Sequence, residues 1–459
     1  MNSCNAIANG PHSEVDKMTW LDNGQIRLGV DLTLGGAVTY LGPSKTGPNL
    51  INSHDCGREI QMSFYSGPTP YAPNGHAPNP AWAGLGWNPI QCGDCYDHRS
   101  VVLECKNDGN EVHVKCIPMH WPLNNVPGEC TFECIFKLRG NVVEVTSRLN
   151  NDRPDVTQYP AHPQELPAVY TNGPWYKLVS YLGDQPYSGG AATTIVDKDD
   201  GKGFPWINFN ATERWTALID KTGFGLGVWN PGTTDFSGGF AGRKGAGGEQ
   251  DNPTGYIAPN RFEILDHNIV YVYHYSLIVG TLDQIRSYAY AHKPEADAPS
   301  YVFSSDRQGW SCAQCSDAGW PIAGGLHITV PANSVGALAG PRDFWIAGKA
   351  PTLYIRAGFK TDAKNLNITC EANAIGDTPC WGSPPPVRRT TTPISVDIIG
   401  DGKIRTYAAN LNANSDYYGG MEKIKISLPP GEANVLGIGF DRKTISRATE
   451  KYTKDETTQ

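Results

Sequence analysis

The segment at residues 161–170, AHPQELPAVY, combines side chains that can transfer protons with a stiff backbone. Each proline fixes its own φ and pushes the residue before it toward extended geometry, so the segment is poorly suited to a helix. Such a backbone would hold His162, Gln164 and Glu165 in fixed positions, as acid–base catalysis requires. We expect Glu165 to act as a general acid or base with His162 as its partner, and Gln164 and Tyr170 to bind substrate. The alternative is that Glu165 satisfies backbone N–H groups of a tight turn.

A second group of polar side chains lies at residues 52–65, NSHDCGREIQMSFY. Side chains of a strand alternate between its two faces. One face of this strand would then carry Glu59, Gln61 and Ser63. A polar face inside a large sandwich is typical of a ligand groove, because buried polar groups need partners; a solvated strand face is the alternative. We expect Glu59 and Arg58 to be catalytic, since a guanidinium can clamp a carboxylate or several hydroxyls, and Gln61 and Tyr65 to bind substrate.

A long segment without a clear strand follows at residues 66–98. Loops of this length in compact domains are usually functional or disordered. Aromatic side chains argue against disorder here, and they are Tyr71, Trp82, Trp87 and Tyr96. Aromatic faces suit the apolar C–H faces of sugar rings, so we expect these side chains to contact a carbohydrate. The alternative for each of them is packing of the loop onto the sheet.

Other candidates border this loop or lie on predicted strands. At the end of the loop, Asp94 could supply a catalytic carboxylate and Arg99 could bind sugar hydroxyls. His120 is expected in the groove, with a packed histidine as the alternative. Trp215 begins a predicted strand and is expected to contact substrate.

Bulk composition describes a folded chain of about two domains. The 459 residues are 39% hydrophobic, 10% aromatic and 18% charged, which leaves little room for disorder except at the ends. A formal charge of -8 argues against nucleic acid as a partner, because phosphate binding needs clustered Lys and Arg. No apolar run reaches transmembrane length, so no membrane partner is expected. The first residues lack the apolar core of a signal peptide.

Twelve cysteines are a high number for a cytosolic enzyme. Cys105 and Cys116 flank a hairpin turn, and Cys130 and Cys134 share one face of a strand. Such placement suits disulfides in an oxidising compartment. We therefore expect a secreted protein whose signal peptide is not present in this chain.

Short motifs add little chemistry. Sequons at Asn210 and Asn367 agree with a secreted glycoprotein. CGDC at 92–95 and CAQC at 312–315 lie too far apart for a usual zinc site, which favours disulfides or packed thiols. Motifs such as GxSxG, GxGxxG, a P-loop and HExxH are missing from the sequence, and we expect neither a cofactor nor a metal ligand set.

Most of the chain reads as strand after strand, with turn signals between them. The pattern at residues 20–295 predicts one large antiparallel catalytic unit, preceded by an N-terminal lead segment at 1–19. Near the end of this unit, the segment LDQIRSYAYAH has the hydrophobic period of a helix. A linker at 296–310, a smaller β-sandwich at 311–445 and a polar tail at 446–459 follow. The predicted fold class is all-β, a large antiparallel β-supersandwich followed by a smaller C-terminal β-sandwich.

The strand GGAVTYL followed by HDCGREI resembles the opening of galactose-mutarotase-like (aldose-epimerase-type) β-supersandwiches. In those proteins a strand pair leads to an arginine that reaches into a sugar-binding groove. The resemblance covers residues 20–295 and implies a large twisted sandwich whose concave face binds a carbohydrate. The family includes aldose epimerases, which use a histidine acid and a carboxylate base, and domains of polysaccharide lyases and glycoside hydrolases. The long aromatic loop and the extra C-terminal sandwich depart from the epimerases and favour a longer carbohydrate over a free monosaccharide.

These observations predict a secreted carbohydrate-active enzyme, a glycoside hydrolase or polysaccharide lyase, that cleaves an oligo- or polysaccharide. Hydrolysis would need two facing carboxylates, Glu165 with Glu59 or Asp94. Elimination would instead need a tyrosine or histidine together with Arg58, and the strand DHNIVYVYHYS supplies both residue types. A non-catalytic glycan-binding protein and a sugar epimerase are the alternatives. The sugar, the linkage, the disulfide connectivity, a bound calcium or other metal and the oligomeric state are left open by the sequence.

Overall fold

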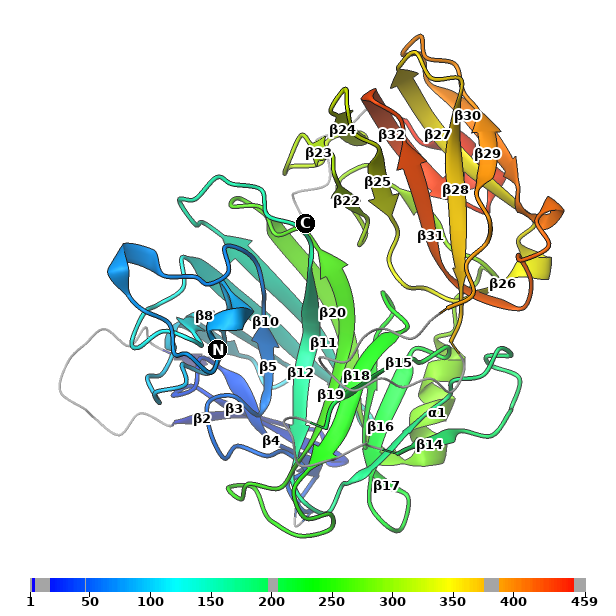
Figure 1. Ribbon diagram of the computed structural model, residues 1–459. Helices are drawn as coiled ribbons and strands as arrows, with labels where there is room; N and C mark the ends of the chain where they lie inside the picture. The colour runs from blue at the N-terminus through cyan, green and yellow to red at the C-terminus, as the bar shows by residue number, and fades with distance from the viewer. Residues whose placement is uncertain (1, 5–16, 46, 197–204, 375–387, 450–459) are drawn as a thin grey trace. The chain divides into compact units, whose positions relative to one another are not determined.

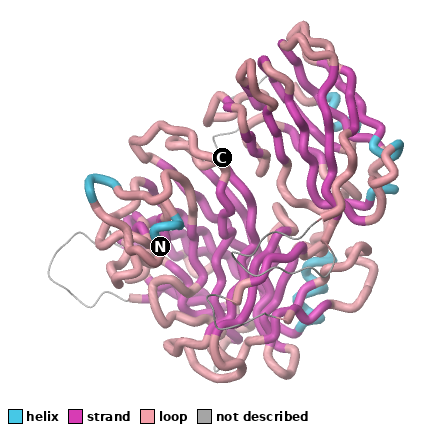
Figure 2. The backbone as a smooth tube through the Cα atoms, in the orientation of Figure 1, coloured by secondary structure: helices cyan, strands magenta, loops and turns pink. Residues whose placement is uncertain are grey.

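The computed structural model describes residues 2–4, 17–45, 47–196, 205–374 and 388–449. The chain divides into two compact units. The first unit consists of Met1–Arg261, His267–Lys293 and Gly376–Pro385, and the second of Phe262–Asp266, Pro294–Ile375 and Pro386–Gln459. Strands dominate both units (Figures 1 and 2), which confirms the predicted all-β class.

Two ten-stranded sheets build the first unit. In order of pairing, the first sheet contains β1 (Asn2–Cys4), β7 (Val101–Asn107), β8 (Glu111–Ile117), β10 (Cys130–Arg139), β11 (Val142–Asn151), β20 (Val270–Thr281), β17 (Phe224–Trp229), β16 (Trp215–Ile219), β13 (Lys177–Ser180) and β14 (Thr193–Ile195). The second sheet contains β15 (Ile207–Asn210), β18 (Asp235–Ala241), β19 (Thr254–Glu263), β12 (His162–Thr171), β5 (Ile60–Ser63), β4 (Ala37–Pro43), β3 (Ile26–Asp31) and β2 (Met18–Asp22), with β6 (Pro89–Ile90) and β9 (Met119–His120) beside β5. Neighbouring strands run antiparallel, as β10 and β11 do.

The two sheets of this unit pack face to face. Phe64, directly after β5, packs edge to face on Phe132 of β10 with ring centroids 5.4 Å apart, and it also contacts Tyr271 of β20. Met62 of β5 points the same way, since its sulfur lies 3.4 Å from the sulfur of Cys134. Because side chains alternate along a strand, the polar residues of β5 point to the outer face of the second sheet. The candidate site described below lies on that outer face.

The helix α1 (Leu282–Ala291) forms where the sequence shows a helical period. The side chain of Thr281 accepts a hydrogen bond from the backbone N–H of Gln284, and the side chain of Gln284 accepts one from the backbone N–H of Thr281, a capping box that begins the helix. Ile285 and Ala289 are buried against strands β16, β17 and β20.

Two six-stranded sheets build the second unit. One contains β23 (Ser316–Asp317), β24 (Leu326–Val330), β32 (Gly431–Gly439), β27 (Thr352–Lys360) and β30 (Arg405–Asn410), with β21 (Ser300–Val302) beside β32. The other contains β22 (Ser311–Ala313), β25 (Gly336–Ala339), β31 (Gly420–Leu428), β28 (Asn365–Ala372) and β29 (Ile394–Asp397), with β26 (Trp345–Ile346) beside β31. The short helices of this unit are η3 (Ala347–Lys349), η4 (Leu411–Ala413) and α2 (Arg442–Arg447). One hydrophobic core, which includes Phe303, Trp310 and Trp345, joins its elements.

The segments expected as linker and tail contain regular structure. Strand β21 falls within the expected linker at 296–310, because Tyr301 packs into the core of the second unit. Helix α2 continues to Arg447, inside the expected tail at 446–459, of which residues 450–459 lie outside the described part. The expected lead at 1–19 contains β1 and the beginning of β2.

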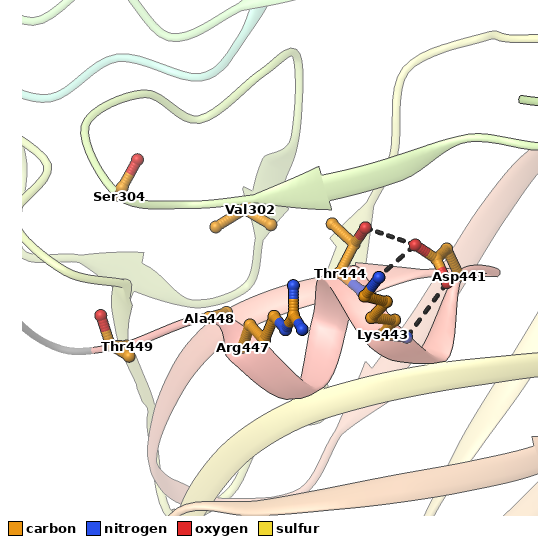
Figure 3. A pocket seen from close by; sticks show the side chains of 8 residues that line it. All are labelled: Val302, Ser304, Asp441, Lys443, Thr444, Arg447, Ala448 and Thr449. Atoms are coloured by element: carbon orange, nitrogen blue, oxygen red, sulfur yellow. Dashed lines mark hydrogen bonds between the residues drawn. The ribbon is translucent and has the colours of Figure 1, made fainter. Parts of the chain in front are cut away.

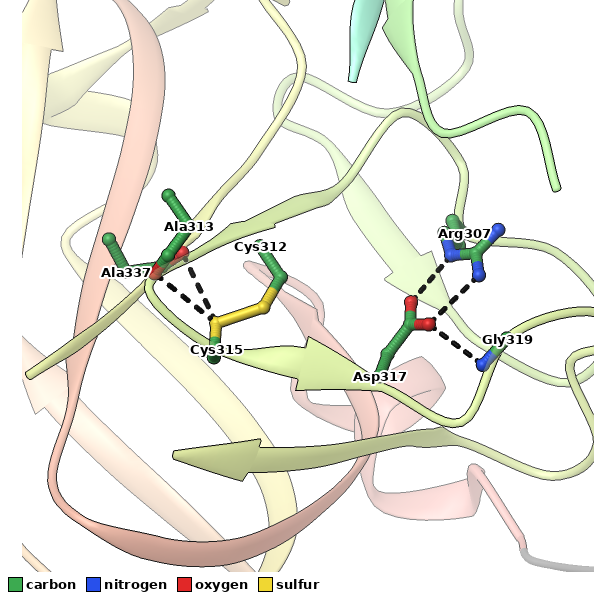
Figure 4. Close-up of a disulfide and its surroundings, with 7 residues drawn as sticks. All are labelled: Arg307, Cys312, Ala313, Cys315, Asp317, Gly319 and Ala337. Atoms are coloured by element: carbon green, nitrogen blue, oxygen red, sulfur yellow. Dashed lines mark hydrogen bonds and ion pairs between the residues drawn. A yellow bond between two sulfur atoms is a disulfide. The ribbon is translucent and has the colours of Figure 1, made fainter. Parts of the chain in front are cut away.

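Three of the four strand cysteines expected in disulfides are free thiols. Within the described part of the chain, the structure has one disulfide, Cys312–Cys315 of the CAQC motif (Figure 4). The free cysteines include three of the four strand residues expected to be bridged, which are Cys116, Cys130 and Cys134. The prediction is wrong for these three, because they are buried between strands, where a free thiol packs as a small apolar side chain.

Candidate active site

Glu165 of β12 holds its carboxyl group between two tyrosine hydroxyls. Oε2 of Glu165 accepts a hydrogen bond of 2.8 Å from the hydroxyl of Tyr65, which follows β5. Oε1 accepts a short hydrogen bond from the hydroxyl of Tyr256 of β19. The side chain is 8% exposed, so the carboxyl group is largely removed from water.

Burial changes the acidity of this group. Burial raises the pKa of Glu165, and hydrogen bonds from Tyr256, Tyr65 and Ser63 oppose that rise without cancelling it. Burial and the nearby charge of Glu165 raise the pKa of Tyr65 and of Tyr256 well above the usual range of a phenol. The tyrosines therefore remain donors, and Glu165 keeps its proton to a higher pH than an exposed glutamate does.

A bulge in β12 decides which side chains share the face of Glu165. Glu165 pairs with Ser63 of β5, but the next pair is Ala168 with Gln61, so β12 has one residue more than β5 in this interval. Strict alternation would place Glu165 and Tyr170 on opposite faces, because they are five positions apart, an odd number. The additional residue brings them to the same outer face of the sheet.

Two more aromatic rings pack against Tyr256, which donates to this carboxyl group. The ring of Tyr170 lies 5.0 Å from that of Tyr256, and the ring of Trp206 lies 4.8 Å from the same tyrosine. Tyr170 is partly exposed, whereas Trp206 and Tyr256 are buried. An acid next to a partly exposed aromatic face is an arrangement that suits a sugar ring with its hydroxyl groups.

Gln164 and His162 do not take the expected roles. Gln164 is 0% exposed: its Oε1 accepts from the backbone N–H of Tyr65 and its Nε2 donates to the carbonyl of Tyr65, both at 2.8 Å. It therefore positions Tyr65 and does not contact substrate. His162 is partly buried, and burial lowers the pKa of its imidazole. His162 is three positions before Glu165 on the strand, an odd number, so alternation places it on the other face and not beside that carboxyl group.

The guanidinium of Arg58 binds protein groups. It donates at 2.8 Å to the carbonyl of Asn252 and to Oδ1 of Asn252, and it lies 3.4 Å from the carboxylate of Asp55. The same segment fastens the loop before β19 a second time, through Nδ2 of Asn52 and the carbonyl of Asp251 at 2.8 Å. Arg58 thus clamps a loop, which corrects the expectation that it clamps substrate.

The segment around Cys92 covers the side chains of Glu59 and Gln61 and binds both of them. Oε1 of Gln61 accepts from the backbone N–H of Cys92 at 2.9 Å, and Nε2 donates to the carbonyl of Arg58 at 2.7 Å. Sγ of Cys92 lies 3.1 Å from Oε2 of Glu59. Glu59 is 1% exposed, and burial raises its pKa well above the usual range. Both side chains hold the loop onto the sheet, so the expected catalytic and substrate-binding roles are not supported.

The long loop at 66–98 contains two short helices, η1 (Pro73–Gly75) and η2 (Ala83–Leu85). The carboxylate of Glu129, a residue that the sequence analysis did not select, attaches this loop to the sheet. Glu129 accepts hydrogen bonds from the hydroxyl of Tyr71, from Nε1 of Trp87 at 3.2 Å and from Nε2 of His120 at 2.9 Å. Burial works to raise the pKa of Glu129, but the hydrogen bonds of His120 and Tyr71 and the charge of His120 outweigh it and hold the pKa at about 2. Trp87 and His120 are both 0% exposed, so they pack the loop onto the sheet, as the alternative interpretation has it.

The remaining predicted residues lie outside the group around Glu165. Asp94 is 0% exposed and accepts from the backbone N–H groups of Tyr96, His98 and Asn125, so it cannot serve as a catalytic carboxylate there. Trp215 is 0% exposed in the core beneath α1 and cannot contact a substrate.

Three predicted sugar contacts remain accessible but lie elsewhere on the loop. Trp82 packs against Trp121 with centroids 5.6 Å apart. Tyr96 is 40% exposed. Arg99 donates to the hydroxyl of Thr33 at 3.2 Å.

A cavity of about 540 Å³ in the second unit carries no comparable chemistry (Figure 3). Lys443 and Arg447 of α2 lie on its wall beside Asp441. The carboxylate of Asp441 accepts from the backbone N–H groups of Lys443 and Thr444 at 3.0 and 3.2 Å. This carboxylate therefore caps the helix.

Among the described residues, no group of three or more His, Cys, Asp or Glu side chains is arranged to hold a metal ion. None of the described helices is long and apolar enough to cross a membrane.

Comparison with known proteins finds similarity in structure and not in sequence. No family model matches the chain, and no curated protein does. A putative aldose 1-epimerase from Escherichia coli K12 is 11% identical over 58% of this chain and 99% of its own, with a TM-score of 0.35. A galactose mutarotase-like protein from Lactobacillus casei is 11% identical over 57% of this chain and 99% of its own, with a TM-score of 0.36. A 4-α-glucanotransferase from Thermococcus litoralis is 10% identical over 58% of this chain and 37% of its own, with a TM-score of 0.31.

The first two of these proteins carry the names of the galactose-mutarotase-like group that the sequence resembles. At such TM-scores the similarity carries no argument about activity, which is inferred below from the residues around Glu165.

Proposed function

We propose that the first unit is a carbohydrate-active enzyme in which Glu165 transfers a proton to or from a sugar. One observation carries the proposal: a buried carboxyl group with a raised pKa lies between two tyrosine hydroxyls. A partly exposed aromatic ring, Tyr170, packs against one of these tyrosines, Tyr256. A carboxyl group with a raised pKa keeps its proton to a higher pH and can act as a general acid.

Cleavage of a glycosidic bond is the reaction that such an acid serves most directly. Protonated Glu165 would donate to the leaving-group oxygen while Tyr65 and Tyr256 stabilise the carboxylate that forms. A double-displacement or inverting hydrolase needs a second carboxylate. Glu59 and Asp94, the two that the sequence suggested, are enclosed by protein contacts. Hydrolysis would therefore use a group other than these two.

Epimerisation at the anomeric carbon is the second candidate. The groups that act on Glu165 through hydrogen bonds are the hydroxyls of Tyr256, Tyr65 and Ser63, and a second carboxyl group is not among them. Proton transfer at a hemiacetal can use one carboxyl group with phenols as partners. A glycan-binding protein without catalysis remains the alternative from another class, because stacking residues serve both purposes.

Mass spectrometry of an oligosaccharide panel after incubation with the protein tests the proposal. Fragments that have gained water indicate hydrolysis, fragments without that water indicate elimination, and unchanged masses with altered anomeric NMR signals indicate epimerisation. Glu165→Gln keeps the shape of the side chain and should lower the rate by roughly 10²–10⁴-fold. Glu144→Gln, on an exposed surface ion pair, is the matched control. Full activity of Glu165→Gln, or binding without turnover by the wild type, would remove catalysis from the proposal.

Secretion belongs to the same proposal. Its support is the Cys312–Cys315 disulfide and the exposed sequon at Asn367. The free thiols of the first unit do not add to that support. Peptide mapping of the protein from a secretory host, for an N-glycan on Asn367, tests it.

A further inference from the structure

We propose that Ser63 is a positioning residue for the acid Glu165, because its hydroxyl aims the hydroxyl of Tyr65 at that carboxyl group. This inference rests on the proposed function of Glu165 and adds a residue that acts on it through Tyr65. The sequence alone places Ser63 on a polar strand face and gives it no role of its own.

A chain of two hydrogen bonds joins Ser63 to Glu165. Oγ of Ser63 donates to the hydroxyl oxygen of Tyr65 at 3.0 Å, and that hydroxyl donates to Oε2 of Glu165 at 2.8 Å. The bond from Ser63 occupies a lone pair of the tyrosine oxygen and leaves the tyrosine proton for Glu165. A hydroxyl that accepts one hydrogen bond also becomes a stronger donor in the next, because each bond polarises the group.

The pairing of β5 with β12 fixes this chain. Ser63 is the direct partner of Glu165 in the antiparallel register, and side chains of directly opposite residues share one face of a sheet. The amide of Gln164 binds the backbone N–H and the carbonyl of Tyr65, both at 2.8 Å. The backbone of Tyr65 is therefore fixed by Gln164, and the far end of its side chain by Ser63.

Burial makes the hydroxyl of Ser63 hard to replace by water. Ser63 is 2% exposed and Glu165 is 8% exposed, so the hydroxyl needs a partner within the protein. The rival interpretation is direct donation to Glu165, since the hydrogen bond of Ser63 also lowers the pKa of that carboxyl group. A serine hydroxyl has one proton, and the 3.0 Å contact assigns it to Tyr65.

The titratable neighbours of Glu165 include four phenols, which belong to Tyr65, Tyr170 of β12, Tyr256 of β19 and Tyr273 of β20. Burial raises the pKa of each of them well above the usual range of a phenol. These four groups keep their protons over the range in which a carboxyl group titrates. A change in the titration of Glu165 therefore does not report the ionisation of these tyrosines.

Infrared difference titration of Glu165 tests the inference without relying on turnover. The band of its protonated carboxyl group is identified by its loss in Glu165→Gln. Ser63→Ala should raise the pKa of Glu165 by about 0.3–1 unit, from weaker polarisation of Tyr65 up to loss of its whole hydrogen bond. Ser63→Thr keeps a hydroxyl and should leave the pKa in place. The matched control is Ser180→Ala, which removes another buried hydroxyl, one that donates to the carbonyl of Trp215 at 2.7 Å.

A double variant separates action through Tyr65 from direct action. Ser63→Ala combined with Tyr65→Phe should show the same pKa of Glu165 as Tyr65→Phe alone. Two single shifts that add up in the double variant, or an unchanged pKa in Ser63→Ala, would overturn the inference.

Turnover of the oligosaccharide panel distinguishes this inference from the proposed function. The alkaline limb of kcat/KM should follow the infrared pKa from variant to variant. If Glu165→Gln abolishes turnover and Ser63→Ala shifts neither the limb nor the infrared pKa, the proposed function stands and only the inference is wrong. If the infrared shifts occur but Glu165→Gln keeps full activity, the proposed function is wrong, and Ser63 positions a group that takes no part in catalysis.

Discussion

The hydroxyl of Tyr65 donates a 2.8 Å hydrogen bond to Oε2 of Glu165, although 100 residues separate the two in the chain. The contact depends on a third residue, because the amide of Gln164 binds both the backbone N–H and the carbonyl of Tyr65. Two neighbouring residues of β12 thus act together: Glu165 provides the acid, and Gln164 holds Tyr65, whose hydrogen bond changes the pKa of that acid. This pair sets the acidity on which the proposed catalysis depends.

Tyr65→Phe should move the alkaline limb of the activity profile to higher pH by roughly one unit. The hydrogen bond from Tyr65 stabilises the ionised form of Glu165 and opposes the rise in pKa caused by burial. A hydrogen bond to a charged group contributes about 1.5 kcal/mol, which corresponds to about one pKa unit. A general acid works while it is protonated, so a higher pKa extends activity to higher pH. The pH dependence of kcat/KM, compared between variant and wild type, measures the shift.

The exposed Tyr96 offers a matched control for that experiment. Tyr96→Phe should leave the pH profile where it is. An alkaline limb that stays in place in Tyr65→Phe, or moves to lower pH, would mean that Glu165 is not the acid that the profile reports.

Tyr256→Phe should move the same limb in the same direction and further. Of the hydrogen bonds that oppose the effect of burial on the pKa of Glu165, the one from Tyr256 has the largest effect. The two single variants and the double variant, measured in the same buffers, establish the order. A larger shift in Tyr65→Phe than in Tyr256→Phe would reverse the relative importance of the two donors.

Glu129→Gln should destabilise the first unit at pH 7 by roughly 1–3 kcal/mol, because Tyr71, Trp87 and His120 lose a charged acceptor. The pKa of Glu129 in the folded protein is about 2, below its usual value of 4.5. The stability that its charge provides is therefore present above pH 4.5 and is lost as the pH falls toward 2. Urea unfolding of wild type and variant at pH 7 and at pH 3 measures both parts.

The difference between wild type and Glu129→Gln should be smaller at pH 3 than at pH 7. Glu111→Gln, in the surface ion pair with Lys137, serves as the control and should show no comparable change. A difference that grows on acidification would show that the carboxylate of Glu129 is not what attaches the loop.

Arg307→Ala should destabilise the second unit by about 3–5 kcal/mol. The guanidinium is 2% exposed and bridges Asp266 and Asp317, each at 2.6 Å, as Figure 4 shows for Asp317. Its removal leaves two buried carboxylates without their cation. Thermal unfolding followed by calorimetry measures the loss of stability. Arg405→Gln, which removes the exposed ion pair with Asp401, is the control and should unfold like wild type. Equal unfolding of the two variants would show that the Arg307 bridges contribute no stability.

Expression through a secretory host should place an N-glycan on Asn367 and not on Asn210. Asn367 is exposed on β28, whereas Asn210, at the end of β15, is 8% exposed and therefore closed to modification in the folded unit. Peptide mapping by mass spectrometry, before and after removal of N-glycans, identifies the modified site, and Asn367→Gln should abolish the glycan. A glycan on Asn210, or a secreted protein with none, contradicts the prediction.

Much of the fold could be predicted because the signals are local. Alternation in segments such as EVHVKCI depends on residues two positions apart, and the turns between strands depend on a few Gly, Asn and Asp residues. The helical period of LDQIRSYAYAH is equally local and became α1. Buried strand cysteines were misread as disulfides, since a thiol that packs and a thiol that pairs look alike in sequence.

The sequence by itself determined the all-β class and placed Glu165, Tyr65 and Tyr170 among the candidates, because residue type and local pattern are enough for that. Only the tertiary structure decided which candidates meet. A bulge in β12 places Glu165 and Tyr170 on one face of the sheet. Strand pairing places Tyr256, 91 positions away in the chain, next to Glu165. Loop contacts bury the carboxyl groups of Glu59 and Asp94. Register, burial and hydrogen-bond partners depend on contacts between distant parts of the chain, and such contacts leave no periodic signal in the sequence.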